Sequence, residues 1–189
     1  MRFFNEFHLA IKAMKMDYHL GMRFDPSLKS KWDLILFSAS FHGLVLYRLS
    51  HMFWKLRWKF LAMIFRGIAR VRYSMDIHPA AEIEPGIFID HGMGVVIGDT
   101  ASVGSGTLIY HGVTLGSVHL IKGKRHPTIG RDVLIGANAT VLGPVKICDG
   151  VKIGANSVVI HDVPCVCTVV GNPARIVKIV ESKKRDDVV

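Results

Sequence analysis

The sequence predicts a mainly β fold, in which six-residue repeats wind into a prism of stacked coils behind a helical N-terminal region. Aliphatic residues recur at Ile77, Ile83, Ile89, Ile97, Val103, Ile109, Leu115, Ile129, Ile135, Val141, Ile147, Ile153 and Val159. Glycine directly follows many of them, and small or β-branched residues lie four positions beyond. Each unit is therefore a short strand and a corner. Three units make one coil, and stacked coils bury a core that no single unit could bury.

The preceding residues are predicted to be helical. Trp32 to Phe60 is apolar on several faces, as in one long helix packed between neighbours, and Asp25-Pro26 is typical of a helix start. We expect three segments, namely a helical region over 1–72, a β-helical domain over 73–178 and a charged C-terminal tail over 179–189.

Composition limits the classes of function. The formal net charge is +9 and the pI is ≈ 9.7, which fits a membrane surface or an anionic ligand better than nucleic acid, because basic and aromatic residues do not interleave. Three cysteines predict no disulfide framework. The uncharged stretch Leu34–Tyr47 is shorter than the roughly 20 residues of a spanning helix. We expect a cytoplasmic protein, and a peripheral membrane contact through the basic helical region stays open.

The six-residue period breaks twice, and both breaks adjoin a histidine. The step from Ile89 to Ile97 is eight residues, and the step from Leu115 to Ile129 is fourteen, which leaves room for a loop over 117–125. Loops that leave a rigid scaffold tend to carry function. The candidates for chemistry are therefore His91 at the first break and His126, with its neighbour Arg125, at the second.

Asp76 and His91 form the first candidate pair. They lie fifteen residues apart, a little under one coil, so we expect them near the same corner of adjacent coils. A carboxylate beside an imidazole orients the ring and raises its basicity, as a general base requires. A structural role is the alternative for any single histidine. We assign no function to His8, His19, His51 or His161, and His78 can simply close a corner.

From about Asp25 to Val177 the chain resembles the serine O-acetyltransferases. The matching pieces are Asp25-Pro26, Phe41-His42-Gly43, Tyr47-Arg48 with His51, D-I-H-P-A-A at 76–81, I-D-H-G at 89–92, H-G-V-T-L-G at 111–116, K-R-H-P-T-I-G at 124–130, I-G-A-N at 135–138, K-I-G-A-N-S-V-V at 152–159 and G-N-P-A-R-I-V at 171–177. The repeat alone is shared by many acyltransferases, whereas D-I-H-P combined with D-H-G and R-H-P is much narrower.

The resemblance implies a left-handed parallel β-helix in a homotrimer, with active sites between adjacent subunits. It implies transfer of acetyl from acetyl-CoA to L-serine, giving O-acetylserine for cysteine biosynthesis, with no metal. His91 matches the catalytic base, Asp76 its carboxylate partner and His126 a second histidine from the neighbouring chain.

The resemblance also implies binding residues. Those for the amino acid are Asp25, Asp90 and Arg125. Those for the CoA donor are Gly116, Ala137, Lys152, Ala155 and Arg175. The two alanines match the edge that lies against the pantetheine arm, and Lys152 and Arg175 match phosphate partners.

Three features depart from the family pattern. The helical region before Asp25 is short, which favours a trimer over a dimer of trimers. The family commonly has a glycine-rich L-G-G-T-G loop, where this chain has the bulkier sequence 115–120. The chain ends in valine rather than isoleucine, so a complex with cysteine synthase is unsupported.

Three other interpretations remain. The bulkier loop and the apolar, basic helices favour an O-acetyltransferase of a sugar or polysaccharide precursor. A zinc enzyme of the γ-carbonic anhydrase type would use the same repeat, but the histidine spacings lack the expected close pair. A scaffold without catalytic activity is disfavoured by the intact set of Asp76, His91 and His126.

Overall fold

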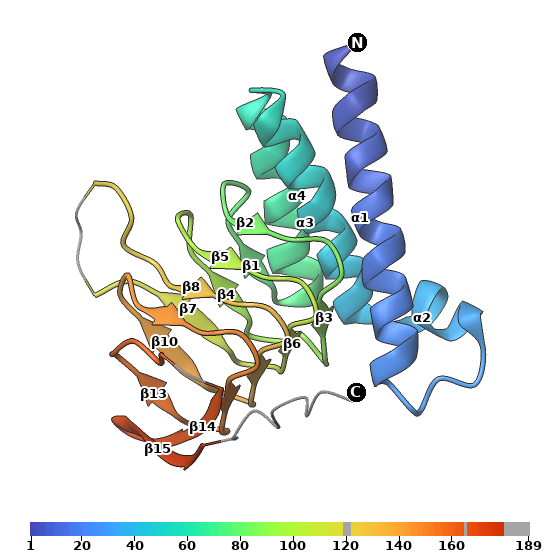
Figure 1. Ribbon diagram of the computed structural model, residues 1–189. Helices are drawn as coiled ribbons and strands as arrows, with labels where there is room; N and C mark the ends of the chain where they lie inside the picture. Colours follow the sequence, from blue (N-terminus) through green and yellow to red (C-terminus); the bar gives the residue numbers. More distant parts are fainter. Residues whose placement is uncertain (119–121, 165, 180–189) are drawn as a thin grey trace, which may run out of the picture.

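The computed structural model describes residues 1–118, 122–164 and 166–179. Its helices are α1 (Arg2–Phe24), α2 (Lys31–Phe37), α3 (Ala39–Lys55) and α4 (Lys59–Tyr73). Its strands are β1 (Asp76–Ile77), β2 (Glu82–Ile83), β3 (Phe88–Ile89), β4 (Val96–Ile97), β5 (Ser102–Val103), β6 (Leu108–Ile109), β7 (Thr114–Gly116), β8 (Thr128–Ile129), β9 (Leu134–Ile135), β10 (Thr140–Leu142), β11 (Lys146–Ile147), β12 (Lys152–Ile153), β13 (Val158–Val159), β14 (Cys167–Gly171) and β15 (Ala174–Ile179). The helices α1, α3 and α4 stand together at the end of the molecule that carries β1 to β3 (Figure 1).

The short strands form the three faces of a left-handed parallel β-helix, which confirms the predicted fold class. The first face is β1-β4-β7-β10-β13, the second is β2-β5-β8-β11, and the third is β3-β6-β9-β12-β14-β15. From β1 to β13 consecutive strands lie on different faces, and each strand pairs in parallel with the strand three places later on its own face. The hairpin of β14 and β15 is antiparallel and closes the far end of the coil.

The core is the stack of aliphatic residues that the period predicted. On the first face Ile77 pairs with Ile97 and Ile97 with Leu115, and all three side chains are buried. One aliphatic layer per coil therefore lies directly on the next and excludes water from the prism interior.

The two breaks in the period lengthen two coils. Thr128 pairs with Lys146, eighteen residues later, as three repeats require. Asp76 pairs with Val96, so the first coil has two extra residues. Ser102 pairs with Thr128, so the coil that contains the loop before β8 has eight extra. Because the strands stay in register, the additional residues leave the prism at its corners. Within that loop, residues 119–121 lie outside the described residues, as do residues 180–189 of the expected tail.

The prediction of one helix over Trp32–Phe60 was wrong. Ser38 ends α2 and also starts α3, where its hydroxyl accepts a hydrogen bond from Phe41 N at 3.2 Å. A second break follows α3, where Arg57 takes a left-handed conformation with φ 66°. A serine that can satisfy the first N–H groups of a new helix allows the chain to turn within an apolar stretch.

Asp25 does not start a helix, which corrects a second expectation. It follows the last residue of α1, and its backbone N–H donates to Gly21 O at 3.0 Å. The start of α2 is capped instead by Ser30, whose side chain forms a capping box with Asp33. The Asp25 side chain is therefore not needed to cap α2.

The helices are attached to the first coil by buried polar contacts. The Arg48 guanidinium donates to both oxygens of Asp17, at 2.8 and 3.0 Å, and to the backbone carbonyl of Ile83 at 2.6 Å. Asp17 also accepts from the backbone N–H groups of Gly86 and Ile87. These contacts fix α1 and α3 against the first coil. None of the described helices is long and apolar enough to cross a membrane.

Candidate active site

His91 occupies a tight turn directly after β3. Its φ is 61° and that of Gly92 is 67°, and Met93 N donates to His91 O at 2.9 Å. A left-handed conformation is uncommon outside glycine, and such residues are often found at functional sites. The turn leaves the side chain 67% exposed, beside Asp90, whose Oδ1 lies 3.9 Å from Nε2. The imidazole is thus presented to solvent at the edge of a rigid coil.

A cavity of ≈ 450 Å³ brings together three of the predicted site residues, namely Asp25, Asp90 and His91. Asp25 comes from the turn after α1, and Asp90 and His91 come from the first coil. Ser40, at the start of α3, also lines the cavity. Apolar side chains such as Phe37 and Met93 complete the lining. Both predicted carboxylates and the imidazole therefore line one small space, together with Asp33 of the α2 capping box.

The side chain of Asp25 is held in place locally. Its Oδ1 accepts hydrogen bonds from Ser27 N at 2.9 Å and Ser27 Oγ at 2.6 Å. Such a turn orients a carboxylate without using both of its oxygens. Oδ2 makes no hydrogen bond with any described residue, so it can accept one from a ligand.

Asp76 does not pair with His91 within one chain, contrary to the expected acid–imidazole contact. Its carboxylate binds Arg66 Nε of α4 at 2.6 Å and lies 4.0 Å from Arg70 Nη1. The reason is the lengthened first coil, in which Asp76 stacks on Val96 rather than on the corner that carries His91. The outward side chain of Asp76 consequently meets α4.

His126 belongs to a second polar cluster. Its Nδ1 lies 2.8 Å from Thr100 Oγ1 and 3.1 Å from Asp99 Oδ1, and the residue is buried. Arg125 binds both oxygens of Asp99 at 2.9 Å. Burial lowers the pKa of His126, the cations Arg125 and Lys124 lower it further, and Asp99 opposes them. At neutral pH this imidazole is therefore kept uncharged.

Within one chain the two histidines lie at different corners of the prism. The His91 corner, as we call it, comprises the turns after β3, β6, β9 and β12, between the third and first faces. The His126 corner comprises the turns after β1, β4 and β7, between the first and second faces. The first face separates the two corners, so one protomer does not assemble both histidines into one site.

The residues expected at the pantetheine arm follow the His91 corner along the coil. The ring of His111 lies edge-on to His91, with centroids 6.1 Å apart. One coil further on, Asn138 N donates to His111 O at 2.9 Å, and then Asn156 N donates to Ala137 O at 2.8 Å. Ala137 and Ala155 thus lie in register on the corner that begins with His91. Their small side chains leave a shallow edge along it.

The remaining donor candidates are more dispersed. Gly116 ends β7 on the first face, and Lys152 is exposed on β12 of the third face. Arg175 lies on β15, where its Nη1 donates to Ala174 O at 3.0 Å. The two cations are therefore both on the third face near the C-terminal end of the coil.

Comparisons with known proteins give the family. The protein-family model described as bacterial transferase hexapeptide (six repeats) matches residues 126–161 of this chain. A serine acetyltransferase of Helicobacter pylori is 49% identical over 151 residues, which are 80% of this chain and 88% of that protein. This chain belongs to the serine acetyltransferase family.

Solved serine acetyltransferases share the fold of this family member. One from Brucella abortus in complex with coenzyme A has a TM-score of 0.86 and 38% identity, covering 88% of this chain and 67% of the other. One from Neisseria gonorrhoeae in complex with serine has a TM-score of 0.84 and 39% identity. The match covers 88% of this chain and 68% of the other.

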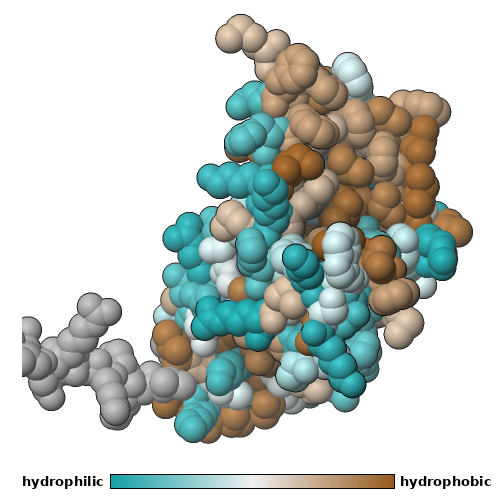
Figure 2. All heavy atoms as spheres, turned by 90° about the vertical axis from the view of Figure 1, so that its right-hand side faces the viewer, coloured by the Kyte–Doolittle hydropathy of each residue, from teal (hydrophilic) through white to brown (hydrophobic). Residues whose placement is uncertain are grey.

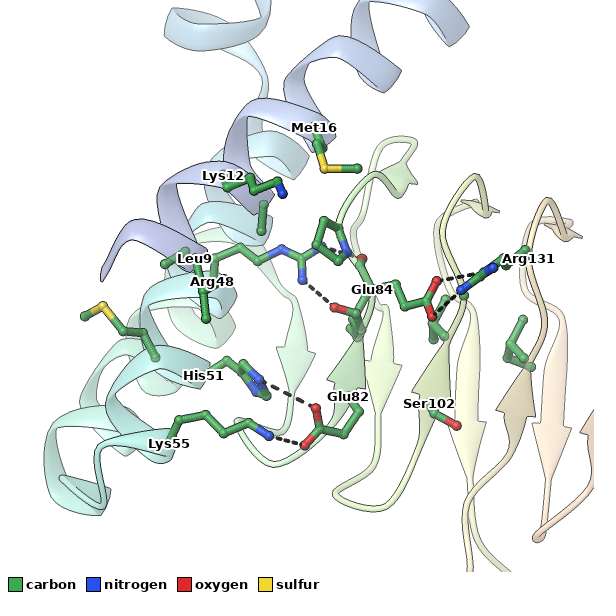
Figure 3. Close-up of a pocket in the computed structure, with 18 of the residues that line it drawn as sticks. Leu9, Lys12, Met16, Arg48, His51, Lys55, Glu82, Glu84, Ser102 and Arg131 are labelled. Carbon is green, nitrogen blue, oxygen red and sulfur yellow. Dashed lines mark hydrogen bonds and ion pairs between the residues drawn. The ribbon is translucent and has the colours of Figure 1, made fainter. Parts of the chain in front are cut away.

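A second cavity of this serine acetyltransferase family member has a larger volume, ≈ 960 Å³ (Figure 3). None of the predicted site residues belongs to its lining. It lies between α1, α3 and the second face, where charged side chains pair with one another. Glu82 binds Lys55, and Glu84 binds Arg131 Nε at 3.0 Å, which lowers the pKa of Glu84 to about 2. It lies at the boundary between the helices and the β-helix, away from the predicted site residues.

Sequence reasoning missed Asp99, the partner of Arg125 and His126. A signal was present, because Asp99 directly follows Gly98 of the repeat, at the corner where the loop with His126 also lies. Arg66, the partner of Asp76, had no comparable signal, since it lies on a helix outside the repeat. Among the described residues, no group of three or more His, Cys, Asp or Glu could hold a metal ion.

Proposed function

We propose that this protein is a serine O-acetyltransferase, which transfers acetyl from acetyl-CoA to the hydroxyl of L-serine. The observation that carries the proposal is the cavity shared by Asp25, Asp90 and His91. Two carboxylates suit the ammonium group of a free amino acid, and the exposed imidazole suits the proton of its hydroxyl. The solved relatives with serine and with coenzyme A support both substrates.

The proposed chemistry is direct transfer. His91 takes the proton of the serine hydroxyl while the oxygen attacks the thioester carbonyl carbon. The carbon–sulfur bond then breaks, and the CoA sulfur leaves with its electron pair and is protonated. Asp90, 3.9 Å from His91, favours the imidazolium formed in this step. In this proposal Asp76, which Arg66 holds, remains a carboxylate partner of the base; because it does not meet His91 within one chain, it would act across the contact between subunits.

We place the CoA arm along the His91 corner, beside Ala137 and Ala155. A thin linear ligand fits against an edge with small side chains, because larger ones would block it. Gly116 would lie on the first face beside this path, and Lys152 and Arg175 would receive the phosphates at its far end.

A trimer explains why His91 and His126 lie at different corners. If the first faces of three protomers surround one axis, the His91 corner of each meets the His126 corner of the next. His126 and Arg125 of the partner subunit would then complete the site, with Arg125 facing the carboxylate of serine. We propose a homotrimer on this ground.

The test is a thiol-release assay with acetyl-CoA and a panel of acceptors. L-serine is expected to be acetylated far faster than sugars, nucleotide sugars or glycans. His91→Ala should lower kcat by about 10²–10⁴-fold, since general-base catalysis contributes that much. His161→Ala, at an exposed histidine with no assigned role, is the matched control. Retention of more than about a tenth of the activity by His91→Ala, or a preference for a sugar, would refute the proposal.

A further inference from the structure

One side of α4 is a continuous apolar stripe whose side chains the described residues leave between 41% and 85% exposed. Phe60, Met63, Ile64, Ile68 and Val71 recur at helical spacing, and Phe60 and Val71 are 81% and 85% exposed. A helix in a globular protein normally buries such a stripe against the core. Figure 2 shows hydrophobic side chains gathered over the helical part of the molecule, whereas hydrophilic residues prevail on the β-helix. The buried side of α4 instead carries Ala62 and Ala69.

The stripe continues onto the start of α1. Trp58, just before α4, stacks on Phe3 of α1 with ring centroids 6.1 Å apart. Phe4 and Phe7 extend the surface along α1, and both are exposed. We call the five apolar residues of the stripe, Trp58 and these three phenylalanines the helical apolar face.

Only positive charge surrounds the helical apolar face along α4. From Leu34 to Met75 the chain contains no Asp or Glu but seven Lys or Arg residues. Arg48 and Arg66 are bound by acidic residues elsewhere in the fold. Arg57, Lys59 and Arg72 are exposed and form no ion pair with any described residue. The Lys59 ammonium lies 5.1 Å from the centre of the Trp54 ring and the Arg72 guanidinium 5.6 Å from that of Tyr73. Long cationic side chains can keep their stems on apolar surface while their charged ends reach polar groups above it.

We propose that the helical apolar face binds the surface of an anionic lipid bilayer. An apolar stripe flanked by unpaired cations is the composition of helices that lie in the plane of a membrane. The apolar side chains would enter the boundary between headgroups and acyl chains, and the three cations would meet lipid phosphates. The proposal is independent of the acetyl transfer, which needs none of these residues.

Charge favours a lipid surface over a second copy of the chain. In a twofold interface the same patch meets itself, and around the axis of the proposed trimer each α4 would meet its copies. In both arrangements the cations of one α4 would approach those of another. No acidic residue of the 34–75 segment could compensate them. An anionic bilayer supplies the compensating charge, and its interface accepts aromatic residues such as Trp58.

The test is sedimentation of the full-length protein with vesicles. We expect it to co-sediment with phosphatidylcholine vesicles that contain a third phosphatidylglycerol, and much less with phosphatidylcholine alone. Because Coulomb attraction is screened by salt, 0.5 M NaCl should weaken binding several-fold. Phe60→Ser/Val71→Ser should lower the partition coefficient by about tenfold or more, since it removes two exposed apolar anchors. Lys59→Gln/Arg72→Gln should lower it on anionic vesicles only.

Matched controls lie on the β-helix. Val177→Ser/Ile179→Ser removes two exposed apolar side chains, and Lys146→Gln/Lys178→Gln removes two exposed cations. Both should bind like the wild type. Failure of the wild type to bind anionic vesicles, or equal binding of Phe60→Ser/Val71→Ser, would overturn the proposal. So would a fall in molar mass by light scattering in that variant, which would assign the face to contact between copies. Serine acetylation by the same samples reports separately on the proposed function.

Discussion

Arg66 of α4 donates a hydrogen bond from Nε to Oδ1 of Asp76 at 2.6 Å. Arg70, one helical turn later, approaches Oδ2 of the same carboxylate at 4.0 Å. The first residue of the β-helix is thereby fixed by a helix that the repeat does not include. A carboxylate held in this way has its charge compensated and its direction set before any substrate binds.

We expect Arg66→Gln to lower kcat/KM by about tenfold, because Asp76 would lose its orienting partner. Arg70→Gln, at the more exposed and more distant arginine, should change it by less than about twofold. If Arg66 acts through Asp76, Arg66→Gln should have little further effect in an Asp76→Asn background. Steady-state kinetics of Arg66→Gln, Arg70→Gln, Asp76→Asn and the double variant Arg66→Gln/Asp76→Asn tests this. Strictly additive losses of transition-state stabilisation in the double variant would contradict the view that Arg66 acts through Asp76.

Gly98 provides the space for the ring of His126. A Cβ at this position would overlap three atoms of the imidazole, so Gly98→Ala must displace it. We expect acetylation to fall by more than about tenfold and stability to fall by about 1–3 kcal/mol, as overpacking usually costs. Gly67→Ala is the control, because a Cβ there meets nothing within 4 Å. That variant should be neutral or stabilised by about 0.5–1 kcal/mol. Thermal unfolding and thiol release measure both, and a fully active Gly98→Ala enzyme would show that His126 is not needed at this position.

The buried pair of Asp17 and Arg48 should be the strongest single polar contact for stability. Their side chains are 1% and 4% exposed, and Asp17 also accepts from Gly86 N at 2.8 Å. Asp17→Ala leaves the buried guanidinium without a counter-charge, with only backbone carbonyls as hydrogen-bond partners, and we expect a loss of about 3–5 kcal/mol by urea unfolding. Glu84→Gln weakens a solvent-exposed pair with Arg131 and should cost less than about 1 kcal/mol. Equal losses of unfolding free energy in the two variants would show that burial does not determine how much an ion pair contributes to stability.

Three histidines should make the fold sensitive to mild acid. Burial is the main cause that lowers the pKa of His51, His78 and His126 below the ordinary value of 6.5. Below about pH 6.5 the unfolded chain therefore binds protons that the folded chain does not, so stability falls as the pH falls. Each such histidine contributes at most about 1.4 kcal/mol per pH unit.

The measurement is the thermal midpoint between pH 8 and pH 5.5. We expect a steady decrease on acidification, and a smaller slope in His51→Gln than in the wild type. His161→Gln, at an exposed position, should keep the wild-type slope. A midpoint that does not change over this range would exclude buried neutral histidines as a determinant of stability.

Much of the fold was predictable because the repeat is a local property. Each aliphatic residue from Ile77 to Val159 marks the position of one short strand. The coil and its two interruptions could therefore be predicted without knowledge of any long-range contact. Helix ends were harder to predict. Ser38 divides α2 from α3 within an apolar stretch, and a single serine gives a weak signal against that background.

The sequence alone determined that the chain forms a β-helix, and that histidines and acidic residues gather where the period breaks. Only the tertiary structure decided which of them meet. Asp25 reaches Asp90 and His91 because α1 and the turn after it are packed against the first coil. Asp76 meets Arg66, and His126 meets Asp99, because side-chain pairing depends on coil length and helix placement. Periodicity is encoded residue by residue, whereas a contact between distant segments depends on how all the intervening elements pack.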